Sequence, residues 1–283
     1  KVIKFIDKNY PALLRQISDC PPVLYVKGEL LPEDSLAIGI VGTRKITSYG
    51  REVTEILTRD LVVSGLTIVS GLALGVDSIA HKTAIEAGGR TIAVVGTGVD
   101  LIYPPENKDL YNSIVRHGAV VSEVPPGNYV QRGIFPARNR IISGLSLGVV
   151  VTEGAEDSGA LISARDAASQ GREVFAVPGP ITSYLSAAPS ILIKNGAKLV
   201  YKVSDILDEL NLKSKKYKVE SRKVIPDNPD EEKILEILAN EQVHIDNLVR
   251  ISGMETGKVS SLLTLMEIKG KIKNLGNMIY CNR

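Results

Sequence analysis

Residues 67–81 read TIVSGLALGVDSIAH, and this stretch constrains the fold more than any other part of the chain. It begins with β-branched residues typical of a buried strand, passes through a turn that contains Gly71 and Gly75, and becomes helical in pattern near Val76. Glycine lets a backbone bend tightly and approach a ligand, and a helix N-terminus offers free N–H groups and a positive dipole end. The stretch therefore predicts a strand–turn–helix unit whose turn faces an anion such as a phosphate ester.

The same alternation of strand and helix continues along the chain. It predicts strands at residues 37–41, 67–70, 91–95, 119–121, 148–152, 174–177 and 198–201, and helices at 49–64, 76–87, 107–117 and 160–170. This alternation is typical of an α/β protein, and we expect a Rossmann-like, doubly wound, mostly parallel sheet. An apolar run at 23–26, near prolines, fits a lead-in strand at the sheet edge. Because crossovers are right-handed, the strand-to-helix turns should lie along one edge.

Composition limits the class of partner. The 283 residues, 44% of them hydrophobic, suffice for one large core and a small second one. The net charge is only +2, so binding of nucleic acid would depend on local patches. Cys20 and Cys281 form neither a close pair nor a metal-ligand spacing, and the sequence has no signal peptide and no apolar run of about eighteen residues. We expect a cytosolic protein with no membrane segment, no cofactor and no catalytic nucleophile.

Four of the predicted turns contain glycine and would meet in one crevice. They are Gly42-Thr43-Arg44-Lys45, Ser70-Gly71, Gly96-Thr97-Gly98 and the stretch 153–159. One such turn is weak evidence, since glycine is often needed only for turn geometry, but four of them with hydroxyl groups and Arg44 predict an anion site. The sequence has no Gly-x4-Gly-Lys-Ser/Thr motif, and residues 96–101 lack the third glycine of a dinucleotide fingerprint, which argues against ATP and NAD.

A second group of candidate ligands follows the loop at 125–133, which is rich in proline and glycine. It is the segment Phe135-Pro136-Ala137-Arg138-Asn139-Arg140. Guanidinium groups match phosphate oxygens, and a neighbouring aromatic ring can stack on a base. Alternatively, an arginine pairs with Glu123 or Glu153 to hold the loop. Because the two arginines stand two residues apart, one facing the ligand and one structural is a natural division.

Other side chains have two interpretations each. Asp77 and His81 lie four residues apart, a spacing that could bind a metal or form a base with its orienting carboxylate, but no third ligand is nearby in sequence. A neutral His81 that anchors the helix by hydrogen bonds is the simpler interpretation, and no metal is expected. Tyr49, Tyr103 and Tyr129 are further candidates for base stacking, although each also fits a packing role.

The composition changes after Leu210. Residues 211–229 form a basic linker with Lys213, Lys215, Lys216, Lys218, Arg222 and Lys223, whose charge fits solvation or the tracking of phosphates. Residues 230–283 predict helices at 230–239, 245–252 and 255–269 and a hairpin at Gly276-Asn277, which is the pattern of a small winged-helix domain. The third helix begins with one cation, Lys258, so docking to a protein fits as well as reading of duplex DNA.

Residues 1–210 resemble the DNA-processing protein A (DprA/Smf) family. The resemblance rests on residues 40–44, 68–81, 91–96, 103–104, 122–123, 135–145, 158–161 and 174–179, and the C-terminal winged helix resembles the family in architecture. It implies a cytosolic bacterial protein that binds single-stranded DNA, dimerises through its Rossmann-like domain and loads the RecA recombinase during natural transformation. No enzyme activity is implied.

The resemblance also implies which residues contact DNA. The pocket would be lined by Gly42, Thr43, Arg44, Ser70, Gly71, Arg138, Asn139, Arg140, Ser158 and Gly159, with Arg51 and Lys194 on its rim and Phe135 stacking on a base. One departure stands out, because Ala188-Pro189-Ser190 precede Leu192-Ile193 where the family usually carries Gly-x-Asn. We therefore expect a reshaped loop and a less well aimed Lys194.

Two further classes of function stay open. Related Rossmann-like phosphoribohydrolases cleave nucleoside monophosphates, but they carry Pro-Gly-Gly-x-Gly-Thr-x-x-Glu where this chain has EGAEDSGA from Glu153, without the double glycine and without the catalytic glutamate at its place. The other class is an adaptor whose winged helix docks a protein. For a single-strand binder that grips phosphates, base identity should matter little.

Overall fold

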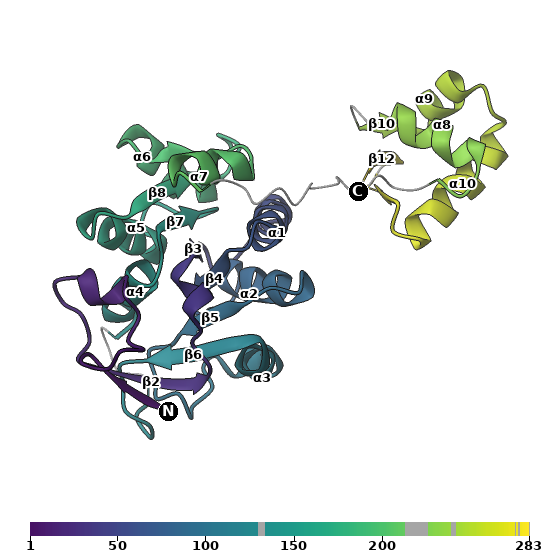
Figure 1. Cartoon of the computed structure of the whole chain (residues 1–283). Helices are drawn as coiled ribbons and strands as arrows, with labels where there is room; N and C mark the ends of the chain where they lie inside the picture. Colours follow the sequence, from purple (N-terminus) through teal and green to yellow (C-terminus); the bar gives the residue numbers. More distant parts are fainter. Residues whose placement is uncertain (130–133, 213–225, 239–241, 275, 277, 283) are drawn as a thin grey trace. The chain divides into compact units, whose positions relative to one another are not determined.

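The first part of the chain is built on a nine-stranded sheet with the order β1-β2-β6-β5-β4-β3-β7-β8-β9 (Figure 1). Strands β3 to β9 run parallel to their neighbours, whereas β2 pairs antiparallel with β6 and β1 with β2. The strands are Val2–Lys4 (β1), Val23–Gly28 (β2), Ala37–Val41 (β3), Thr67–Ser70 (β4), Thr91–Val94 (β5), Gly118–Ser122 (β6), Gly148–Val151 (β7), Glu173–Ala176 (β8) and Lys198–Leu199 (β9).

The computed structural model describes residues 1–129, 134–212, 226–238, 242–274, 276 and 278–282. The chain divides into two units with separate cores, Lys1–Tyr217 and Lys218–Arg283. The predicted basic linker lies largely outside the described residues. Within the described ranges, no helix combines the length and the apolar composition needed to cross a membrane.

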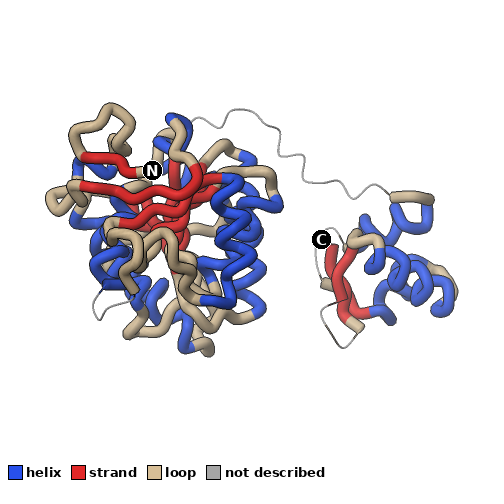
Figure 2. Tube along the Cα trace, turned by 90° about the horizontal axis from the view of Figure 1, so that it is seen from below, coloured by secondary structure: helices blue, strands red, loops and turns tan. Residues whose placement is uncertain are grey.

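Helices cover both faces of the large sheet (Figures 1 and 2). One layer contains α1, α2, α3 and α7, and the other contains α4, α5 and α6. The helices are Ser48–Val63 (α1), Val76–Glu86 (α2), Lys108–His117 (α3), Ile134–Gly144 (α4), Gly159–Ser169 (α5), Ala187–Lys194 (α6) and Val203–Glu209 (α7). The predicted α/β fold with a doubly wound, mostly parallel sheet is therefore confirmed.

The strands form where the sequence predicts them because both of their faces are buried. Every residue of β3 to β7 is buried, so these strands read as continuous apolar runs. One core packs the sheet against α4 and α5, and a second packs it against α1, α2 and α7. The observed bounds agree with the predicted ones or differ from them by one or two residues. Helix α4 forms at the predicted arginine-containing segment, and β1, α6 and α7 are additional elements.

The order of the strands reverses between β3 and β7. From β3 the chain proceeds through β4, β5 and β6 toward one edge, and from β7 through β8 and β9 toward the other. In open α/β sheets a crevice forms outside the carboxyl ends of the strands at such a switch point. The predicted glycine turns follow β3, β4, β5 and β7, so the fold places all four turns at the carboxyl ends of the parallel strands.

In its described residues the second unit contains three helices and a three-stranded sheet, so the predicted helices and hairpin are found and one further strand joins the sheet. Its elements are Pro229–Ile237 (α8), Val243–His244 (β10), Ile245–Ser252 (α9), Thr256–Ile268 (α10), Ile272–Asn274 (β11) and Ile279–Asn282 (β12). Lys258, the cation at the start of the third helix, pairs with Asp230 of α8 at 2.7 Å. Buried Glu231 pairs with Lys271 at 2.5 Å and so joins α8 to the residue that precedes β11. Asn277 of the predicted hairpin lies outside the described residues.

Gly75 is a position where the backbone requires glycine. Its φ is +79°, and a Cβ there would overlap the carbonyl oxygen of Thr43. We expect Gly75→Ala to lower the free energy of unfolding by about 2–3 kcal/mol, because strain at φ and a steric overlap add. Urea denaturation followed by circular dichroism measures the change.

The matched control is Gly88→Ala. Gly88 has a similar φ of +75°, but a Cβ there would meet no atom within 4 Å. This variant should lose only about 1 kcal/mol, the cost of the backbone conformation alone. Equal losses in the two variants would contradict the steric account of Gly75.

Candidate nucleic-acid interface

A pocket of about 400 Å³ lies at the carboxyl ends of β3 and β7, where the strand order reverses. Three segments bring predicted site residues to it: the turn after β3, the helix α4 and the turn into α5. The predicted residues that line it are Gly42, Thr43, Arg44, Arg138, Asn139, Ser158 and Gly159. The structure therefore brings together seven of the predicted residues from parts of the chain more than one hundred positions apart.

Arg138 forms a buried, positively charged part of this pocket. Its side chain is nearly buried, and its Nη1 donates hydrogen bonds to the carbonyl oxygens of Gly71, at 2.6 Å, and of Val94. Burial lowers the pKa of Arg138 to about 10, although the carboxylate of Asp77 opposes that effect, so the guanidinium stays charged at neutral pH. A Cβ at Gly71 would overlap the guanidinium, which explains the glycine.

The groups beneath Arg138 form a buried polar network. Asp77 accepts hydrogen bonds from the backbone N–H groups of Gly71 and Ala73, at 3.1 and 3.4 Å, and burial raises its pKa. His81 Nδ1 lies 2.6 Å from the hydroxyl of Thr91, which donates to the carbonyl oxygen of Ile68. The imidazole is therefore the donor to Thr91, and burial lowers the pKa of His81 to about 3.

This geometry agrees with the hydrogen-bonding interpretation of His81 rather than with a metal site. Asp77 and His81 each have backbone or hydroxyl partners of their own. In the part of the chain that the structure describes, no group of three potential ligands could hold a metal ion.

Ser70 belongs to the wall behind the pocket rather than to its surface, whereas Gly42 lines the pocket and also makes room for a helix. Ser70 is fully buried, and its hydroxyl donates to the carbonyl oxygen of Ile40 at 2.6 Å. A Cβ at Gly42 would lie 2.6 Å from Val76 Cγ2, so this glycine allows α2 to approach the turn after β3. The glycine at position 42 and the hydroxyl group of Ser70 are therefore both explained by packing and internal hydrogen bonding, without a ligand contact.

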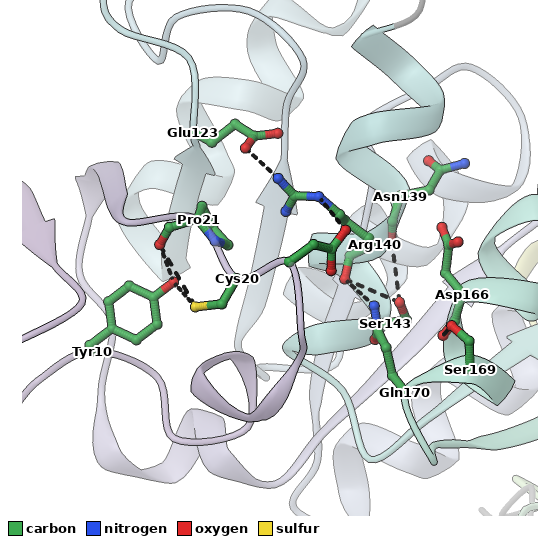
Figure 3. A network of polar contacts seen from close by, with 11 residues as sticks. Tyr10, Cys20, Pro21, Glu123, Asn139, Arg140, Ser143, Asp166, Ser169 and Gln170 are labelled. Carbon is green, nitrogen blue, oxygen red and sulfur yellow. Dashed lines mark hydrogen bonds and ion pairs between the residues drawn. The ribbon is translucent and has the colours of Figure 1, made fainter.

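Arg140 lies away from the pocket and forms two ion pairs. Its Nε lies 3.0 Å from Asp19 Oδ2, and its Nη2 lies 2.5 Å from Glu123 Oε2 (Figure 3). The backbone carbonyl oxygen of Arg140 also accepts a hydrogen bond from Gln170. Arg140 therefore has the structural role that the sequence allowed for one of the two arginines, and the geometry does not favour it as a phosphate ligand. The ligand contact of Arg138 stays a prediction.

The remaining predicted residues are dispersed. Arg51 is exposed on the first turn of α1 and Lys194 is exposed at the last residue of α6, and neither lines the pocket. The backbone of Phe135 belongs to α4, but its side chain lies outside the described part of the structure. Tyr49 donates its hydroxyl to the carbonyl oxygen of Pro178 at 2.5 Å, and Tyr129 is exposed.

Two further pockets continue this pocket along the carboxyl ends of the strands. On one side a pocket of about 90 Å³ shares Arg44 and Arg138 with it and includes Tyr103. On the other side a pocket of about 510 Å³ shares Ala155 and Asp157 with it and includes Tyr184. We call this continuous surface, from Tyr103 to Tyr184, the edge groove.

Tyr184 is a residue that the sequence analysis missed. It belongs to a short turn of 3-10 helix, Tyr184–Ser186, which has no periodicity to reveal it. Its position after the predicted strand at 174–177 was the available signal, because that strand ends at the same edge of the sheet as the glycine turns.

Two family models match the chain. One is described as DNA recombination-mediator protein A and matches residues 1–211, and the other is described as DprA winged helix domain and matches residues 220–278. The chain belongs to the DprA/Smf family. The resemblance stated from the sequence motifs is therefore confirmed, and the second family model also identifies the C-terminal unit as the family's winged helix.

The chain is similar in sequence to individual DprA/Smf proteins over most of its length. It is 46% identical to DNA processing protein DprA of Bacillus subtilis over 216 residues, which is 76% of this chain and 73% of that protein. It is 39% identical to protein Smf of Escherichia coli over 279 residues, or 93% and 72% of the two chains. The crystal structure of Streptococcus pneumoniae DprA matches with a TM-score of 0.70 and 42% identity, covering 74% of each chain.

A second solved structure concerns DNA processing protein A of Helicobacter pylori and is described as giving insight into its single-stranded DNA binding mode. It matches with a TM-score of 0.66 and 30% identity, covering 74% of this chain and 98% of that one.

The buried His81 predicts a dependence of stability on pH. The folded state holds the imidazole neutral down to a pKa of about 3, whereas the unfolded chain takes up a proton near 6.5, so stability is lost as the pH falls below 6.5. We expect His81 to account for a loss of about 2 kcal/mol between pH 7 and pH 5. Urea denaturation at both values, for the parent and for His81→Gln, measures it. An equal loss in both proteins would contradict the neutral, buried state.

Proposed function

We propose that this protein binds single-stranded DNA in the edge groove by its phosphates and delivers it to the RecA recombinase, acting in the bacterial cytoplasm during natural transformation and recombination. The observation that carries the proposal is the pocket at the switch point, which joins Arg44, Arg138 and the N-terminal turn of α5. Guanidinium groups and a helix N-terminus are the groups that phosphate oxygens prefer. The Helicobacter pylori relative, whose structure is described by its single-stranded DNA binding mode, supports the same ligand.

The ends of the edge groove favour a single strand over a duplex. Tyr103 is 45% exposed at one end and Tyr184 is 69% exposed at the other. Exposed aromatic rings can stack on bases only where those bases are unpaired and accessible. A groove with arginines in its middle part and aromatic rings at its ends fits a strand whose phosphates and bases both contact protein.

The surroundings of Glu153 support binding rather than nucleotide cleavage. This carboxylate is buried and accepts hydrogen bonds from the backbone N–H of Thr47, at 3.0 Å, and from its hydroxyl, at 2.5 Å. It therefore holds the N-terminus of α1 and does not line the pocket. Asp77, which does line it, is committed to two backbone N–H groups. Incubation with nucleoside monophosphates and chromatography of the products tests the alternative, and release of free base would favour it.

RecA delivery and a homodimer formed through the Rossmann-like unit belong to the same proposal. The description of the first family model as a recombination mediator supports the recombinase role. The winged helix is the candidate for a protein contact, since Lys258 at the start of α10 is paired with Asp230 and Leu265 and Ile268 of that helix are exposed.

Binding to oligo-thymidine should be strongly salt dependent. About four neutralised phosphates give a slope near −0.7 each for single strands, so affinity should fall roughly fifty-fold between 50 and 200 mM salt. We expect Arg44→Ala to weaken binding roughly fivefold at low salt and to reduce the slope by about 0.7. Fluorescence anisotropy of labelled oligo-thymidine and of its duplex counterpart measures both quantities.

Arg116→Ala is the matched control for Arg44→Ala. Arg116 is exposed in the last turn of α3, which leads into the start of β6 at the opposite edge of the sheet. This variant removes the same charge and should leave affinity and slope unchanged. Equal effects of the two substitutions would place binding outside the edge groove, and the absence of single-strand binding by the parent would overturn the proposal.

The recombinase role has its own measurement. RecA filaments should form sooner on single-stranded DNA coated with a single-strand binding protein when this protein is added, because a mediator supplies strand that RecA can nucleate on. Arg44→Ala should delay that onset in proportion to its lost affinity. If neither the parent nor Arg44→Ala makes the filaments form sooner, RecA delivery is contradicted, whereas the proposed binding of single-stranded DNA is unaffected.

A further inference from the structure

The two sides of the edge groove carry opposite charge. Arg44 and Arg138 lie in the part shared with the Tyr103 pocket, whereas Glu156 and Asp157 lie in the part beside Tyr184. Glu156 and Asp157 are both exposed, and Asp157 lines both the central pocket and the Tyr184 pocket. Because like charges repel, phosphates of a bound strand should stay on the arginine side.

The walls of the Tyr184 pocket are fixed to each other. The backbone N–H of Gly154 donates to the carbonyl oxygen of Leu185 at 2.7 Å, and the N–H of Ala188 donates to the carbonyl oxygen of Gly154 at 2.8 Å. Leu185 and Ala188 are buried. A Cβ at Gly154 would lie only 3.0 Å from Ala188 Cβ, so glycine permits this close approach. The acidic loop and the turn that carries Tyr184 are therefore held side by side before any ligand binds.

The chemistry of this pocket suits a base better than a phosphate. Its lining consists of an aromatic ring, two carboxylates and the small residues Ala155 and Ala187. The exposed ring of Tyr184 offers a face for stacking, which every base can use. Ionised carboxylates only accept hydrogen bonds, so they select a base edge that donates.

The bases differ in what they offer a carboxylate. Cytosine presents the amino group at its position 4, with which Asp and Glu pair in nucleic-acid complexes. Adenine and guanine also have exocyclic amino groups. Uracil and thymine present carbonyl oxygens on both sides of their single ring N–H, and these oxygens repel a carboxylate.

We propose that the pocket formed by Tyr184 and the 155–157 loop holds one nucleobase of the bound strand, stacked on Tyr184, with Asp157 accepting a hydrogen bond from an exocyclic amino group. This inference rests on the proposed binding of single-stranded DNA in the edge groove. It adds one base-dependent position to a strand that is otherwise held by its phosphates. A strand that contains cytosine, adenine or guanine should therefore bind more tightly than one made only of thymine or uracil.

The sharpest test compares oligodeoxycytidine with oligodeoxyuridine of the same length at neutral pH. Their backbones are identical, and the bases differ at position 4, where cytosine has an amino group and uracil a carbonyl oxygen, and at ring nitrogen 3, which carries a proton only in uracil. Competition against a labelled strand, read by fluorescence anisotropy, gives the ratio of their affinities. We expect the parent protein to prefer cytosine by about fivefold or more.

Asp157→Asn should reduce that preference to less than about twofold, because an amide can both donate and accept and so pairs with either base. It should also raise the affinity for both strands, since a negative charge leaves the groove. Glu173→Gln is the matched control, because Glu173 is exposed at the start of β8, at the opposite edge of the sheet. That variant should keep the preference of the parent.

Tyr184→Ala tests the stacking part separately. It should weaken binding of both strands about fivefold or more without changing the salt slope, and Tyr184→Phe should restore the affinity. Equal affinity of the parent for the two strands, or no effect of Tyr184→Ala, would overturn the base pocket while leaving the phosphate grip intact. No single-strand binding by the parent would instead overturn the proposed function itself, so the two failures can be told apart.

Discussion

A single buried guanidinium connects the strand ends and turns that form the proposed binding surface. Arg138 comes from α4, yet it donates to carbonyl oxygens at the carboxyl ends of β4 and β5. Burying a cation is costly unless polar partners replace water, and here two carbonyl groups and the nearby charge of Asp77 do so. Asp77 belongs to α2 on the other face of the sheet and accepts a hydrogen bond from the N–H of the same Gly71, so both helical layers meet at this turn.

The close approach of buried groups also explains the glycines around the groove. Gly71 leaves room for the Arg138 guanidinium, Gly42 for α2, and Gly50 for the carboxylate of Glu153, which holds the start of α1. In each case the missing Cβ serves a buried polar group or a packed helix. The proposed binding of anions therefore depends on charged side chains and a helix end that these close approaches position, and only indirectly on glycine.

Most of the fold could be predicted from the sequence because buried parallel strands have a recognisable apolar pattern. The strands β3 to β7 read as apolar runs, and the helices that cover them have a marked periodicity. The roles of Arg138 and Arg140 could not be assigned in the same way. The partners of Arg140, Asp19 and Glu123, are far from it in sequence, and only the folded chain shows that they meet.

Other parts of the site could not be predicted from the sequence because they depend on local structure and on neighbours in space. The sequence predicts Ser70 and Gly71 as ligand contacts, and the structure places Gly71 at the Tyr103 pocket but buries Ser70, whose hydroxyl binds the neighbouring strand. Tyr184 could not be identified from the sequence pattern because a single turn of 3-10 helix has no periodicity. The winged helix was recognised by its order of elements, and the pairing of Lys258 with Asp230 became visible only in three dimensions.

The backbone of Gly154 has a mechanical consequence. Its N–H and its carbonyl oxygen both bind the segment that begins α6, one as donor and one as acceptor. A displacement of α6 must therefore carry the 155–157 loop with it or break one of these hydrogen bonds. The position of the start of α6 and the position of the acidic side of the groove are therefore coupled through the two backbone groups of one buried residue.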